Sequence, residues 1–116
     1  IATYSIRARG PLQRAGDLSG GNQQKVVLAR ELDPRPHVIV AAEPTRGLDI
    51  EATEFVHEQL RNAARSGAAL VLITSDLDEA FDLGDVLHVI YRGNLSAPMS
   101  RREAAERVAN LMAGVA

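Results

Sequence analysis

Two short apolar runs separated by an amphipathic helix constrain the fold of this chain more than any other feature. Val38–Ala42 and Ala69–Thr74 are continuous apolar stretches of strand length, the pattern of strands buried in a parallel sheet. Between them an apolar stripe recurs at helical spacing, with charged side chains on the opposite face. Helices that alternate with buried strands predict an α/β layered fold with a mostly parallel sheet. The stripe consists of Ala52, Phe55, Val56, Leu60 and Ala63, and the charged face of Glu51, Glu54, Glu58, Arg61 and Arg65.

Turn and capping residues set the ends of the predicted helices. The first helix runs from Ser19 to about Leu32 and ends near Asp33-Pro34, because proline disfavours helix in the residue before it. Asp49 suits the N-cap of the middle helix, and Gly67 is its expected C-terminal cap.

The C-terminal third of the chain predicts shorter elements. We expect a short helix over residues 78–83, a strand over 86–91, a tight hairpin turn at Arg92-Gly93-Asn94 and a brief strand over 95–97. Ser100 and Glu103 have the spacing of a capping box and start a final helix, which Gly114 ends.

Composition excludes several classes of protein. A length of 116 residues allows one domain at most, and the first residue, Ile1, indicates a piece of a longer protein or a processed chain. The net charge of −2 does not favour a nucleic-acid partner, and the lack of cysteine excludes disulfides and cysteine-based metal sites. No apolar run approaches the roughly 20 residues that span a bilayer, so we expect a soluble chain in a cytosolic setting.

The start of the first helix has the chemistry of a phosphate-binding surface. Ser19 suits a helix cap, and Gly20 and Gly21 let backbone N–H groups approach an anion at the positive end of the helix dipole. Asn22 and Gln23 complete this first turn. The same glycines also occur in ordinary turns and caps, so the motif gains weight from a second motif, which lies one helix and one strand later in the chain.

A carboxylate stands where α/β sheets place their ligands. Glu43 directly follows the first predicted strand, and the C-terminal ends of strands form the ligand crevice of open α/β sheets. A carboxylate there suits the orientation or deprotonation of an attacking water. The alternative is a solvated loop acid ahead of Pro44.

The phosphate-binding P-loop is not part of the sequence. That loop needs a glycine followed by lysine and then Ser or Thr, but the single lysine, Lys25, follows Gln24.

Taken together, Leu18–Lys25 and Glu43–Asp49 resemble the signature, Walker B and D-loop elements of an ATP-binding-cassette (ABC) ATPase. The chain is most similar to the ATP-binding subunits of bacterial simple-sugar and nucleoside importers, to which Asn22 and Arg46 both point. The resemblance runs from about Gly16 to Pro98 and covers the C-terminal half of the second nucleotide-binding domain of such a subunit. It implies a partial P-loop NTPase fold without the Walker A strand and loop. The chain is then a single partial domain: a connector over 1–17, the ATPase core over 18–98 and a C-terminal helix over 99–116.

The resemblance also implies roles for single residues, with ATP and Mg²⁺ as cofactors of the intact assembly. Glu43 corresponds to the catalytic acid, whereas Ala42 stands where the family has an aspartate that supports Mg²⁺. Ser75 occupies the place of the switch histidine, although a plain helix-entry serine is the equal alternative. Gly47, Leu48 and Asp49 match the D-loop.

In the family, two such domains pack head to tail, and each ATP lies between the Walker A loop of one domain and the signature of the other. The residues Ser19, Gly20, Gly21, Asn22 and Gln23 would then serve the opposite domain's ATP, while Glu43 and Ser75 would line a degenerate site of their own domain. The implied partners are a second nucleotide-binding domain, transmembrane permease subunits and, through the permease, a soluble substrate-binding protein, with no nucleic acid. The implied location is the cytoplasmic face of the inner membrane, and the 116 residues alone are expected neither to bind ATP tightly nor to hydrolyse it.

Two alternatives stay open at the level of sequence. One is a fragment of an ABC-type DNA-repair or chromosome-organising ATPase, which would favour basic surfaces or long coiled coils. The other is a non-catalytic regulatory module that keeps the ABC fold. His37, His57 and His88 have no metal-binding spacing, and His57 is predicted on the polar face of its helix, so no metal ligand is assigned.

Overall fold

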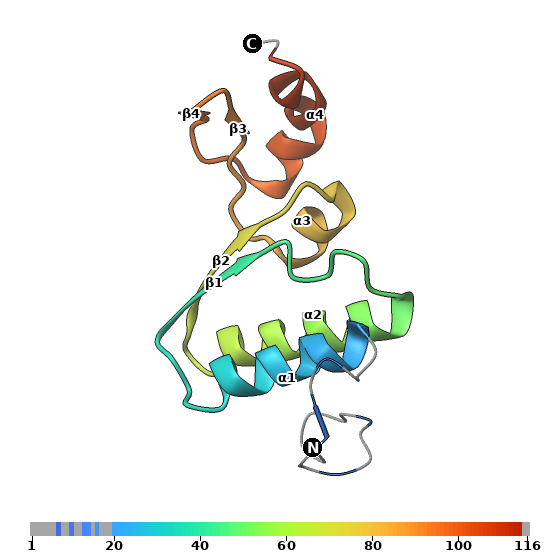
Figure 1. Cartoon of the computed structure of the whole chain (residues 1–116). Helices are drawn as coiled ribbons and strands as arrows, with labels where there is room; N and C mark the ends of the chain where they lie inside the picture. Colours follow the sequence, from blue (N-terminus) through green and yellow to red (C-terminus); the bar gives the residue numbers. More distant parts are fainter. Residues whose placement is uncertain (1–6, 8–9, 11–12, 15, 17–19, 115–116) are drawn as a thin grey trace. The chain divides into compact units, whose positions relative to one another are not determined.

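The structure is a computed structural model, and it describes residues 7, 10, 13–14, 16 and 20–114 of the chain. The described residues form two compact units, one ending at Ile73 and the other beginning at Thr74 (Figure 1). Ser19 and most of the expected connector lie outside the described residues.

The first unit has the predicted alternation of helices and strands. Its elements are α1 (Gly20–Leu32), β1 (Val38–Ala42), α2 (Ile50–Arg65) and β2 (Ala69–Ile73). β1 and β2 pair in parallel, from Val38 opposite Ala69 to Ala42 opposite Ile73. The α/β class and the parallel pairing predicted from the apolar runs are therefore confirmed.

Capping explains where α2 begins and ends. Asp49 is its N-cap, and the Asp49 carboxylate accepts a hydrogen bond of 2.8 Å from the backbone N–H of Ala52. At the other end Ser66 is the C-cap, and Gly67 follows it as the terminating glycine that was predicted, with its N–H donating to the carbonyl of Ala64 at 3.1 Å. Gly67 is the next residue, and its φ of 108° is a conformation that glycine adopts without steric cost.

The two faces of the β1–β2 sheet differ, which corrects the prediction of fully buried strands. Exposed and half-buried positions alternate along both strands. Val38 and Val40 are 62% and 64% exposed, and Val71 and Ile73 are 50% and 47% exposed. α1 and α2 lie side by side along the other face (Figure 1). The buried aliphatic side chains of this unit therefore lie on its helices: Leu28, Ala52, Val56 and Leu60.

The second unit contains shorter strands than predicted. Its elements are α3 (Leu77–Leu83), β3 (Ile90–Tyr91), β4 (Asn94–Leu95) and α4 (Arg101–Met112). The strand expected over 86–91 is reduced to β3, with one isolated bridge between Leu87 and Met99, and the strand expected over 95–97 is β4. Asn94 pairs with Tyr91 and belongs to β4, so Arg92 and Gly93 alone form the turn. Both have positive φ, 47° and 81°, as a two-residue type I′ turn requires.

A cluster of side chains from the hairpin region and α4 forms the core of the second unit. Ser100 caps α4 by accepting a hydrogen bond of 3.2 Å from the N–H of Glu103, as the capping-box spacing predicted. The helix ends at Met112 with Ala113 as C-cap, and Gly114 follows with a φ of 80°, so Gly114 lies just beyond the predicted end. The core consists of Leu87, Val89, Met99, Ala104 and Val108.

Within the part of the chain that the structure describes, no helix combines the length and the hydropathy that a membrane crossing requires.

Candidate functional site

The first turn of α1 holds the predicted phosphate-binding residues Gly20–Gln23, and its two glycines have different surroundings. A Cβ atom added at Gly20 would meet nothing within 4 Å, so this backbone is open to a ligand. A Cβ at Gly21 would lie 3.1 Å from the Cβ of Ala52, closer than most real Cβ contacts. Gly21 thus permits the close approach of α1 to α2, and the role of both glycines toward an anion stays a prediction.

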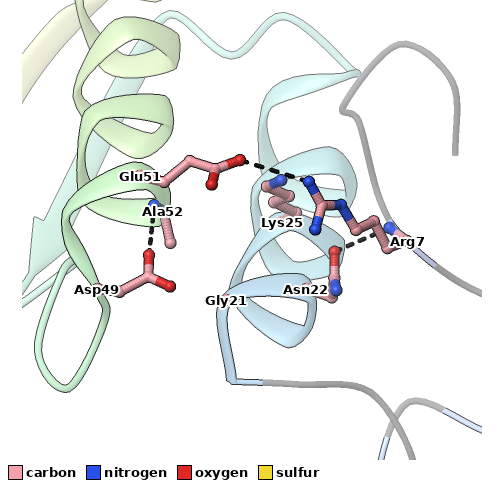
Figure 2. Close-up of a pocket in the computed structure, with 7 residues that line it drawn as sticks. All are labelled: Arg7, Gly21, Asn22, Lys25, Asp49, Glu51 and Ala52. Atoms are coloured by element: carbon pink, nitrogen blue, oxygen red, sulfur yellow. Dashed lines mark hydrogen bonds and ion pairs between the residues drawn. The ribbon is translucent and has the colours of Figure 1, made fainter.

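A small cavity of about 80 Å³ lies between the starts of α1 and α2 (Figure 2). Its rim includes the exposed pair Arg7 and Glu51, whose Nη2 and Oε1 atoms are 3.6 Å apart. The backbone N–H of Arg7 donates a hydrogen bond of 2.8 Å to Oδ1 of Asn22. The two cations of the lining, Arg7 and Lys25, are matched by two carboxylates, those of Asp49 and Glu51. The cavity is therefore balanced in charge.

Lys25 packs inside the first unit and does not extend into solvent. Its side chain is buried, and its Nζ atom lies 4.6 Å from the centre of the Phe55 ring. A cation over an aromatic ring is attracted by the negative face of the ring, by about 0.5–2 kcal/mol. Lys25 therefore joins α1 to α2 one turn beyond Gly21.

Glu43, the predicted catalytic acid, has an unusual backbone conformation at the end of β1. Its φ is 47°, a left-handed value that a residue with a side chain adopts at a cost of roughly 1–2 kcal/mol. Its N–H extends the β ladder by donating to the carbonyl of Ile73 at 2.7 Å, and its own carbonyl accepts from the N–H of Arg46 at 3.3 Å. The sheet thus fixes the strained residue on one side and the following turn fixes it on the other. Strain of this kind is typical of functional positions.

The predicted D-loop residues form the turn that connects Glu43 to α2. Gly47 has a φ of 75°, and the N–H of Leu48 donates to the carbonyl of Thr45 at 3.1 Å. Asp49 ends the turn as the N-cap of α2, which confirms its predicted capping role. We call residues 43–49 the strand-end loop.

One side-chain hydrogen bond joins the start of α1 to the strand-end loop. The amide Nε2 of Gln24 donates to the carbonyl oxygen of Pro44 at 2.5 Å, and the pair is partly buried. Together with the Gly21–Ala52 contact, this bond brings the glycine-rich helix start and the strand-end acid into one packed region of the first unit.

Ser75, the predicted switch position, belongs to the second unit and is exposed. The helix after it is capped by Asp76, whose carboxylate accepts from the N–H groups of Asp78 and Glu79. Thr74 supports this cap, because its Oγ1 accepts from the N–H of Asp76 at 3.0 Å. The capping role at this helix entry therefore falls to Asp76, and the role of Ser75 stays a prediction.

The histidines do not gather at the site. His57 is buried, so its placement on the polar face of α2 was wrong. His37 and His88 are exposed, and Nδ1 of His88 lies 2.9 Å from the carbonyl oxygen of Ser96.

The donor set at the end of β1 does not fit Mg²⁺. Ala42, which precedes Glu43, offers only a methyl group, whereas Mg²⁺ is held by oxygen ligands. Across the described residues, no group of three or more His, Cys, Asp or Glu side chains could hold a metal ion. We therefore derive no step through a metal.

Sequence reasoning missed three residues that build this region: Arg7, Gln24 and Lys25. A signal existed for Lys25, because it shares one helix face with Gly21 and Leu28 at spacings of four and three residues. Nothing in the local pattern indicated that Gln24 donates to Pro44 or that Arg7 reaches Asn22 and Glu51, because these contacts join segments distant in sequence.

Comparison with known proteins gives a consistent set of relatives. No family model matches the chain. The guanosine import ATP-binding protein NupO of Bacillus subtilis (strain 168) is 41% identical over 115 residues, which are 98% of this chain and 22% of NupO. The nucleoside import ATP-binding protein NupA of Lactococcus lactis subsp. cremoris is 39% identical over 84% of this chain and 19% of NupA. The ribose import ATP-binding protein RbsA of Shouchella clausii is 38% identical over 91% of this chain and 21% of RbsA.

Solved structures show the same kinship in three dimensions. An ATP-binding cassette in a dimeric post-hydrolysis state bound to ADP and Pi matches with a TM-score of 0.74 and 27% identity. The match covers 87% of this chain and 44% of the cassette. A dimeric bacterial ABC transporter cassette matches with the same TM-score of 0.74. The chain thus spans about a fifth of the curated relatives and less than half of the solved cassettes.

Proposed function

Since the chain belongs to the ABC ATPase family and has part of its P-loop NTPase fold, we propose that it acts within the ATP-binding subunit of a sugar or nucleoside importer. The observation that carries the proposal is the packing of an open, glycine-rich helix start against a strand-end acid. The relatives supply the transported class, since they are import proteins for guanosine, nucleosides and ribose.

The helix start supplies the first chemical role. The first N–H groups of an α-helix, here those of Gly20–Gln23, point out of its end, and the helix dipole adds partial positive charge there. Together they suit the terminal phosphate of an ATP whose other contacts come from a second nucleotide-binding domain. Gly20, with open space beside it, lets that phosphate approach the main chain.

Glu43 supplies the second role. A carboxylate that orients or deprotonates water contributes roughly 10²–10⁴ in rate when it is well placed. The fixed left-handed backbone at Glu43 places its side chain reproducibly at the end of β1. Ala42, the residue before Glu43, has no carboxylate that could support a metal ion. Ser75, at the predicted switch position, has no positive charge.

From these features we infer two unequal ATP sites in the assembled transporter. The site completed by Gly20–Gln23 hydrolyses ATP, and the site of the domain that carries Ala42, Glu43 and Ser75 turns over slowly. The 116 residues alone, without a phosphate-binding loop, neither bind ATP tightly nor hydrolyse it.

The proposed partners follow from the same assignment. They are a second nucleotide-binding domain, the permease subunits and, through the permease, a soluble substrate-binding protein, and nucleic acid is not among them. The proposed location is the cytoplasmic face of the inner membrane. Residues 18–98 would supply the ATPase core and residues 99–116 a C-terminal helix of one partial domain.

The test uses Gly20, where a new side chain meets no obstruction. In the ATP-binding subunit that contains this sequence, reconstituted with its permease, Gly20→Glu places a carboxylate where the phosphate would bind. We expect uptake and ATP hydrolysis to fall by about 100-fold, the size of effect seen when one stabilising donor to a developing anion is lost. Gly20→Ala is the matched control and should retain activity within a few-fold.

Unimpaired uptake by the Gly20→Glu subunit would overturn the proposal. Glu43→Gln, measured beside it, addresses the second candidate function, a non-catalytic regulatory module, which the methyl group of Ala42 favours. Loss of ATP hydrolysis with Gly20→Glu and a smaller loss with Glu43→Gln would support the unequal sites. No change with either variant would support the regulatory module.

A further inference from the structure

Gln24 lies between the two residue groups to which the proposed function gives separate roles. It comes directly after the first-turn residues Gly20–Gln23 on α1, and its side chain ends on the carbonyl of Pro44, the neighbour of Glu43. The two groups are 20 residues apart in sequence at this bond. This hydrogen bond connects the first turn of α1 directly to the strand-end loop.

The Pro44 carbonyl depends on that bond more than an exposed carbonyl would. Pro44 is buried, and a polar group away from water costs roughly 1–3 kcal/mol when its partner is removed. The strand-end loop is already fixed at its start by the Glu43–Ile73 bond and at its end by the Asp49 cap. The Gln24 bond falls between these two points and fixes the residue directly after the strained Glu43.

The packing of α1 against α2 leaves little freedom for the helix start to move alone. A Cβ atom at Gly21 would lie 3.1 Å from that of Ala52, and Nζ of Lys25 lies 4.6 Å from the centre of the Phe55 ring, so α1 and α2 approach closely on either side of Gln24 in the sequence. A displacement of the first turn of α1 would therefore reach the Pro44 carbonyl through the Gln24 bond.

We propose that Gln24 is a positioning residue that couples the phosphate-binding helix start to Glu43 through the Pro44 carbonyl. This inference rests on the proposed function for its consequence: ATP held at Gly20–Gln23 and the acid at the end of β1 would respond to each other. Gln24 touches neither nucleotide nor water in this role, and its effect is exerted on the loop.

The first experiment needs no nucleotide and uses the ATP-binding subunit that contains this sequence. Amide hydrogen exchange is followed at Arg46 and Leu48, whose N–H groups form the bonds inside the strand-end loop. In Gln24→Leu, which keeps the size but removes the donor, we expect exchange at these amides to rise by about tenfold. Exchange at the core of the second unit should stay unchanged. Gln59→Leu is the matched control, since Gln59 is also half-buried on a helix of this unit and its side chain has no described hydrogen bond.

Gln24→Glu gives a reversible version of the same change. An ionised carboxylate only accepts hydrogen bonds and repels the Pro44 carbonyl, whereas a protonated one donates through its O–H. We expect this variant to behave like Gln24→Leu at pH 7.5 and to recover protection relative to Gln24→Leu at pH 3.5, where a glutamic acid with the ordinary pKa of about 4.3 is mostly protonated. A residue of purely structural importance would show no such recovery.

The second experiment measures ATP hydrolysis in the intact subunit. Gln24→Leu should lower kcat by about tenfold and leave KM for ATP within about twofold, because Gln24 positions the loop and does not bind the nucleotide. For the exchange experiment, equal loss of amide protection in both units would overturn the proposed coupling. Unchanged exchange at Arg46 and Leu48 in Gln24→Leu and Gln24→Glu would overturn it too. An unchanged kcat in an active subunit would overturn it as well. Failure of the proposed function would show separately, as a subunit insensitive to Gly20→Glu.

Discussion

The candidate site of the first unit lies in its strand-end loop, whereas the main feature of the second unit is one hydrophobic core cluster. In the first, buried side chains lie on α1 and α2, alternate residues of both strands stay exposed, and the positive-φ residues lie in the loops before and after the strands. In the second, Leu87 and Met99 pair in an isolated β-bridge and pack with Ala104 of α4 into one cluster. The unit with the candidate site is thus the one whose packing fixes the strained residue Glu43 in place.

The two units also contain the same backbone value for different reasons. Glu43 and Arg92 both have a φ of 47°. At Arg92 the value belongs to a two-residue hairpin turn, where the geometry of the turn requires it. At Glu43 no such hairpin exists, since the chain continues through the strand-end loop into α2. The strain at Glu43 is therefore not explained by a hairpin turn.

Truncation of one buried side chain should produce the largest effect and should destabilise one unit more than the other. Leu60 is 1% exposed and Met99 is 2% exposed, so truncating either to alanine leaves a cavity and should cost about 2–5 kcal/mol. Hydrogen exchange resolved by residue should show protection lost in α1, α2 and the β1–β2 sheet for Leu60→Ala. For Met99→Ala the loss should fall in the hairpin and α4. Equal loss in both units for either variant would contradict the division.

Substitutions at Glu43 and Arg92, the two residues with a φ of 47°, should change stability by intermediate amounts. A β-branched side chain tolerates positive φ poorly, so Glu43→Val should be less stable than Glu43→Gly by about 1–2 kcal/mol, measured by denaturant unfolding. At Arg92, asparagine next to Gly93 gives the preferred sequence for this turn, so Arg92→Asn should gain up to about 1 kcal/mol. Only the Glu43 variants should alter hydrolysis in the intact subunit. If Glu43→Gly kept full activity, the functional explanation of its strain would fail.

The smallest expected effect concerns the contact between α1 and α2. Gly21→Ala gains helix propensity but presses on Ala52, whereas Gly20→Ala meets no neighbour. The double variant Gly21→Ala with Ala52→Gly should relieve this contact. A coupling free energy of about 0.5–1 kcal/mol between positions 21 and 52 is expected from thermal unfolding of the four members of the cycle. Additive effects would show that the contact is not tight.

The helix starts and the β1–β2 pairing were predictable because they follow from local patterns. Apolar periodicity and the caps at Asp49 and Ser100 depend on neighbours within four residues, and the structure confirms both caps. The strand-end position of Glu43 was predictable for the same reason. Its left-handed backbone was not, because glutamate has no preference for that conformation.

The remaining features depend on contacts between distant segments. The exposed face of Val38 and Val40 reflects what packs against the sheet, which hydrophobic periodicity does not encode. The burial of His57 was not indicated by the apolar stripe of α2. The division of labour between Gly20 and Gly21 arises from the position of Ala52, more than 30 residues later in the chain.

The burial of Lys25 against Phe55 of α2 has a practical consequence for chemical labelling of this chain. It is the single lysine of the sequence, and it is 9% exposed with its ammonium group over Phe55. Amine-directed reagents, crosslinkers and acetylating enzymes therefore find no accessible lysine while the two helices stay together. The speed with which this amine is labelled measures how often α1 separates from α2, so one residue acts as a built-in reporter of opening at the proposed phosphate site.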